Sequence, residues 1–118
     1  MPDLTFALDA GADVRRRQIA QLVDACSDAA VAIAEILSDD HDHGLLLLSV
    51  VEAKAALVKA LDRSGCAEGA ALRSGVHRAV ILLQRWLDRG DAHDLTATAE
   101  LLQRADQIAR LEGWRRHA

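Results

Sequence analysis

The sequence contains few prolines, which interrupt helices, and few cysteines, which can crosslink a fold through disulfides. Proline occurs once, in the second position, so it breaks no helix interior. Tyrosine is absent, and the only other aromatic residues are one phenylalanine and two tryptophans. The two cysteines, Cys26 and Cys66, are too few for a disulfide framework. These absences exclude a disulfide-stabilised secreted domain and favour a helical protein in a reducing, cytoplasmic environment.

An excess of positive charge is also lacking. The chain has 18 acidic and 14 basic residues, a net charge of -4 and a pI of about 5.6. A general nucleic-acid binder needs a cationic surface, so we expect no nucleic-acid partner. The first ten residues are acidic and lack a continuous apolar segment, which predicts no signal peptide. The longest apolar run, residues 45–61, contains three charged residues and is too short to span a bilayer.

Alanine and leucine dominate what remains, and 51% of the 118 residues are apolar. Apolar residues recur with helical spacing in four segments, at about 14–37, 45–63, 67–89 and 92–112. Short polar or glycine-containing connections separate these segments, so consecutive helices should be antiparallel neighbours. The pattern predicts an all-α protein, an antiparallel four-helix bundle, in a single domain over residues 1–118. Residues 1–11 should form a short lead-in that ends at Gly11, with Asp13 as the first N-cap.

One charged residue interrupts the apolar face of the second segment. On a helix, that face is predicted to contain Leu46, Leu47, Val50, Ala53, Leu57, Val58 and Leu61. Lys54 falls between the directions of Leu47 and Leu61. It is either a snorkelling or ion-paired lysine at the edge of this face, with Glu68 or Asp94 as the possible carboxylate, or the charge of a partner groove or ligand cavity.

Several apolar residues lie off the predicted core faces. Leu45, Leu48 and Ile81 do so, as expected if a second surface is covered by a partner. Trp114 follows the last helix and either clamps the end of the bundle or marks an interface. Trp86 falls on a core face, although it could also line a pocket with Lys54. The predicted partner-binding or ligand-binding residues are Lys54, Leu45, Leu48, Ile81 and Trp114.

The connection at residues 38–44, SDDHDHG, concentrates possible metal ligands. His41 and His43 form a His-x-His pair that can chelate a transition metal. The rest of a zinc site is missing, and an EF-hand register would place Val50 where a glutamate is required. We therefore favour a solvated turn and expect no cofactor. A GxSxG nucleophile elbow and a phosphate-binding loop are also absent from the sequence, which predicts no enzyme.

Three stretches carry a resemblance to a known family. They are LTFALDAGAD at 4–13, QLVDACSDAA at 21–30 and SVVEAKAALVKALD at 49–62. Over this first half, the chain resembles a family of small, uncharacterised helical proteins common in pseudomonads, which often carry a polar residue at the position of Lys54. The resemblance implies a short helical fold in a bacterial protein and no assigned reaction.

These observations lead to one functional hypothesis and two alternatives. The hypothesis is a non-enzymatic protein–protein interaction module, a homodimer that serves as an accessory subunit or as a stoichiometric inhibitor of the anti-defence or immunity type. The first alternative is a small-molecule-binding or enzymatic bundle with a pocket around Lys54 and Trp86. The second is metal binding through the loop that contains His41 and His43.

Overall fold

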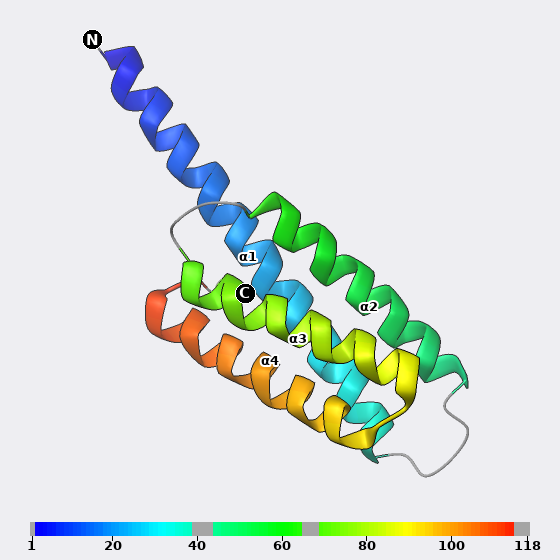
Figure 1. Cartoon of the computed structure of the whole chain (residues 1–118). Helices are drawn as coiled ribbons and strands as arrows, with labels where there is room; N and C mark the ends of the chain where they lie inside the picture. The colour runs from blue at the N-terminus through cyan, green and yellow to red at the C-terminus, as the bar shows by residue number, and fades with distance from the viewer. Residues whose placement is uncertain (1, 39–43, 65–68, 115–118) are drawn as a thin grey trace.

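The chain folds into four helices that run alternately up and down a common axis (Figure 1). A computed structural model describes residues 2–38, 44–64 and 69–114, and it describes side chains only from residue 13 in the first range and residue 47 in the second. The helices are α1 (Pro2–Ser38), α2 (Gly44–Arg63), α3 (Ala70–Arg89) and α4 (Ala92–Glu112). Within those ranges there is no strand, which confirms the all-α antiparallel four-helix bundle.

The first helix is longer than the sequence predicted. It has 37 residues and begins at Pro2, so the expected lead-in, the turn at Gly11 and the N-cap at Asp13 are wrong. Proline is tolerated in the first turn of a helix, and one internal glycine costs only about 1 kcal/mol against alanine. The N-terminal part of α1 projects beyond the other three helices, and the molecule measures 62 × 23 × 23 Å (Figure 1).

Local capping signals mark both ends of α4 and the C-terminal end of α3. The side chain of Asp91 accepts a hydrogen bond from the backbone N–H of His93 at 2.9 Å and begins α4 as an N-cap. Gly90 and Gly113 end α3 and α4 with φ of 73° and 74°, a conformation that glycine adopts without strain. α3 begins at Ala70, three residues after its predicted start at 67.

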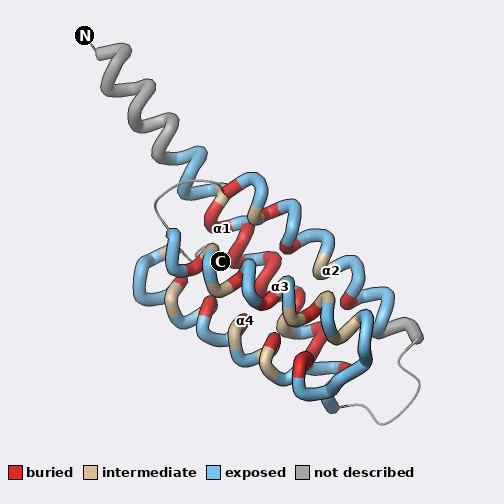
Figure 2. The backbone as a smooth tube through the Cα atoms, in the orientation of Figure 1, coloured by how far each residue is buried: buried red, intermediate tan, exposed pale blue. Residues whose placement is uncertain are grey.

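The core lies along the axis between the four helices, where the buried positions of each helix face the others (Figure 2). Small alanines on these faces let the helices approach closely, and α3 with α4 and α1 with α2 form the most extensive pairs. The largest fully buried apolar side chains are Ile19, Leu22, Ile33, Val50, Leu57, Leu72, Val76, Leu83, Leu95 and Leu102.

The buried face of α2 is narrower than predicted. Val50 and Leu57 are fully buried, and Ala53 and Leu61 pack against the core. Leu47 and Val58, which the sequence placed on the same face, are 41% and 39% exposed. Part of the apolar surface of α2 therefore points away from the core.

Candidate interaction surface

An exposed row of apolar side chains runs along the outside of α2. We call it the α2 strip, and its members are Leu47, Leu48, Val51, Ala55 and Val58. Leu48 is 57% exposed and Val51 is 45% exposed. Residues 48, 51, 55 and 58 are spaced by three, four and three, so they lie within an arc of about 80° on the helix. This is the spacing of the contact seam in helix pairs.

Lys54 lies beside the α2 strip, at the boundary between α2 and α3. Its ammonium group donates a hydrogen bond to Oε1 of Gln84. The amide nitrogen of Gln84 in turn donates to Oδ1 of Asp88 at 2.8 Å. A half-buried lysine is therefore joined to α3 through a short polar chain.

The two carboxylates expected to pair with Lys54 do not appear in this contact. Asp94 is buried and instead lies 3.8 Å from Nε of Arg85, measured from its Oδ2 atom. Glu68 lies outside the described residues. The sequence gives no signal for Gln84 as the partner, because it is 30 residues from Lys54 in the chain and no local pattern links the two.

Ile81 extends the exposed apolar surface onto α3, where it is 49% exposed. It precedes Gln84 by nearly one turn, and Val58 follows Lys54 by about one turn. Because α2 and α3 are antiparallel and joined through Lys54 and Gln84, Ile81 and Val58 lie at similar heights along the bundle. Leu45 belongs to α2, but its side chain lies outside the described residues.

Trp114 lies at the opposite end of α4 from its N-cap and packs against the core. Its indole Nε1 donates a hydrogen bond to Oε2 of Glu112 at 2.6 Å. The guanidinium of Arg16 on α1 lies 5.7 Å from the ring centroid, which is within the range of a cation–π interaction. The contact with Arg16 joins α1 to the end of α4, which supports the interpretation of Trp114 as a clamp.

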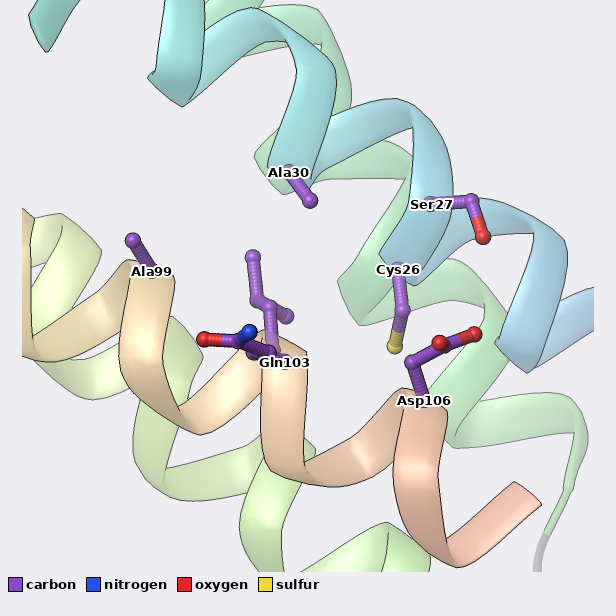
Figure 3. Close-up of a pocket in the computed structure, with 7 residues that line it drawn as sticks. Cys26, Ser27, Ala30, Ala99, Gln103 and Asp106 are labelled. Carbon is purple, nitrogen blue, oxygen red and sulfur yellow. The ribbon is translucent and has the colours of Figure 1, made fainter. Parts of the chain in front are cut away.

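A shallow groove separates α1 from α4 and holds about 370 Å³ (Figure 3). Cys26, Ser27 and Ala30 line it from α1, and Ala99, Leu102, Gln103 and Asp106 line it from α4. Cys26 is 3% exposed, as its core position predicted. Burial, with the nearby charge of Asp106, raises the pKa of the Cys26 thiol to about 12. The thiol is therefore protonated at neutral pH and is a poor nucleophile.

The pocket predicted around Lys54 and Trp86 stays a prediction. Three further grooves lie between α2 and α3, between α1 and α2, and between α3 and α4. Of these four described grooves, none is lined by Lys54 or by Trp86. Trp86 is half-buried and packs against the core.

The predicted metal ligands His41 and His43 lie outside the described residues, so their role stays a prediction. Elsewhere, the residues that the structure describes bring together no group of three or more histidine, cysteine, aspartate or glutamate side chains that could hold a metal ion. Across the described parts of the chain, none of the helices combines the length and the apolar character that a membrane span requires.

Comparison with known proteins adds nothing to this geometry. No family model, no curated protein and no solved structure matches the chain. The resemblance to small helical proteins of pseudomonads therefore stays a prediction.

Proposed function

We propose that the protein is a non-enzymatic interaction module that binds another protein through the outside of α2. The α2 strip carries this proposal. Isolated exposed apolar residues are ordinary on a protein surface, but a continuous row at helix-pair spacing is not. Burial against a partner would remove this apolar surface from water, which is the main favourable term in protein association.

A role as an accessory subunit or a stoichiometric inhibitor is consistent with this surface. Such proteins act by occupying a surface, so they need a binding face and no reacting groups. The single described cysteine is held as a neutral thiol, which supports a binding role over nucleophilic catalysis. The scarcity of cysteine and the acidic composition support the cytoplasm as its location.

Site-specific photo-crosslinking in the source cell tests the proposal. A photoreactive amino acid at Ala55, the exposed centre of the α2 strip, should give a cross-linked adduct that contains a second polypeptide. The same probe at Leu111, which is 88% exposed on α4, is the matched control and should give none. Failure of the Ala55 probe to form any protein adduct would refute an interaction through this face.

A further inference from the structure

The groove between α2 and α3, which we call the α2–α3 groove, contains an arginine without a partner among the described residues. The groove lies where α2 ends and α3 begins, at the end of the bundle from which the N-terminal part of α1 projects (Figure 1). It holds about 430 Å³, a volume within the range of small-molecule sites. The described residues that line it are Leu61, Asp62, Ala70, Arg73, Ser74 and His77.

Arg73 is the residue of this groove whose hydrogen-bonding groups are left unused. It is half-buried, and its Nε atom is buried without a hydrogen-bond partner. Among the described residues, its guanidinium has no carboxylate within ion-pair distance, although Asp62 lines the same groove. A buried N–H group without a partner destabilises a fold, and in native proteins such a group often marks the place of a bound ion or water. An anion in the groove would supply the acceptors that Arg73 lacks.

Two further donor groups lie beside Arg73 on the same face of α3. Positions 70, 73, 74 and 77 are spaced as i, i+3, i+4 and i+7, which places them on one side of a helix. Gln84, which meets Lys54 of α2, lies on this side as well. Ser74 and His77 are exposed, and neither side chain has a partner among the described residues. The guanidinium, the hydroxyl and the imidazole can therefore bind one ligand together.

The charges around the groove define the chemistry of that ligand. The guanidinium of Arg73 is positive, and α3 begins at Ala70, where the helix dipole also favours negative charge. Asp62 carries the opposite charge and only accepts hydrogen bonds, so the part of the ligand beside it must donate them. A phosphate group attached to a hydroxyl-bearing body meets both requirements. Its three free oxygens match the donors of Arg73, Ser74 and His77.

We infer that the α2–α3 groove binds a small phosphorylated molecule. Arg73, Ser74 and His77 hold its phosphate, and its hydroxyl groups donate hydrogen bonds to Asp62. A carboxylate fits less well, because its two oxygens pair with a single guanidinium and leave the other two donors unused. The α2 strip ends at Val58, so the groove is a separate site and adds a small-molecule ligand to the proposed protein partner.

An NMR titration of the full chain with glycerol phosphate tests the inference. Nitrogen–proton correlation spectra contain the Nε–H signals of arginine side chains, so the group that binds is observed directly. We expect the signal of Arg73 to shift until it saturates, glycerol alone to cause no shift, and inorganic phosphate to bind more weakly than glycerol phosphate. An unchanged Arg73 signal at high millimolar glycerol phosphate, or an equal shift of the exposed Arg89, would overturn the site. Equal affinities for the two phosphates would overturn the role of Asp62.

Substitutions distinguish a specific site from general attraction to a charged surface. Arg73→Gln should weaken the binding of glycerol phosphate by about tenfold, because charge-assisted hydrogen bonds are lost. Arg89→Gln removes the same charge from the exposed far end of α3 and should leave the affinity unchanged. Asp62→Asn, at an exposed position, should strengthen the binding of inorganic phosphate, because a repelling charge is removed.

Circular dichroism confirms that each variant remains helical. Wild-type affinity in Arg73→Gln would overturn the inference. An unchanged affinity of Asp62→Asn for inorganic phosphate would also count against it, and this second variant keeps the test decisive if Arg73→Gln does not fold. Tighter binding of acetate than of inorganic phosphate would overturn the assignment of a phosphorylated ligand.

Discussion

Burial of Cys26 predicts a thiol that hardly reacts while the protein is folded. The side chain is 3% exposed and lies near Asp106, and its pKa rises from 9.0 to about 12. Burial is the larger cause, because it removes the thiolate from water, and the negative charge of Asp106 adds to it. The thiolate is the reacting species, so at pH 8 the folded protein should react roughly 1000-fold more slowly than the unfolded chain.

Reaction with a chromogenic disulfide reagent at pH 8 measures this difference. The Cys66→Ser variant leaves Cys26 as the only cysteine, and the unfolded rate is obtained in guanidinium chloride. The free energy of unfolding, measured in parallel, gives the part of the rate that passes through transient unfolding. Asp106→Asn should accelerate the reaction of the folded protein, but by less than unfolding does. A folded rate within tenfold of the unfolded rate would refute the reasoning.

The same pKa shift predicts how stability depends on pH. The unfolded chain loses the Cys26 proton near pH 9.0, whereas the folded protein keeps it until about pH 12. The folded state therefore holds more protons in this window, and its stability falls as pH rises, by up to about 1.4 kcal/mol per pH unit. Below pH 9 the contribution is fully present. Urea titrations between pH 8 and 11 should show a shallower decline for Cys26→Ala, which lacks the titrating thiol.

Three further predictions concern stability and are checked by urea denaturation. Lys54→Met should leave the free energy of unfolding unchanged or raise it by up to about 1 kcal/mol, because methionine keeps a similar stem and removes a half-buried charge. Loss of partner binding at unchanged stability would show instead that Lys54 acts in binding. Gly75→Ala should raise the free energy of unfolding by about 0.5–1 kcal/mol, because a Cβ there meets no atom within 4 Å. Gly90→Ala is the matched control at φ 73° and should lower the free energy of unfolding by about 1 kcal/mol. Equal effects at the two sites would contradict this explanation. Asp91→Ala should lower the free energy of unfolding by about 1 kcal/mol, because the hydrogen bond from the backbone N–H of His93 is lost. An unchanged midpoint of urea denaturation would mean that the N-cap does not stabilise the fold.

Local signals in the sequence were sufficient for much of the fold. Spacing of apolar residues predicted four helices, and the capping residues around α4 placed it at 92–112, the bounds that the structure has. Asp91 and Gly113 act on the backbone within a few residues of themselves, so their effect can be predicted without the tertiary structure. The position of Cys26 on a clean apolar face likewise predicted its burial.

The start of α1 could not be predicted in this way. Residues 2–13 contain alanine and leucine, which favour a helix, and also Gly11 and Asp13, which suggested a turn and an N-cap. These local preferences differ by only about 1 kcal/mol per residue, which is too little to decide where a helix begins. The structure continues the helix through Gly11 to Pro2.

The candidate surface depended on tertiary structure most of all. α2 carries apolar residues around much of its circumference, so its sequence alone does not indicate which of them meet the core. Packing against α1 and α3 buries Val50 and Leu57 and leaves Leu47 and Val58 in water. The partner of Lys54 is likewise decided by the neighbour that α3 brings to it. Helix formation is local and can be inferred from periodicity, whereas the choice of a buried face depends on contacts between segments far apart in the chain.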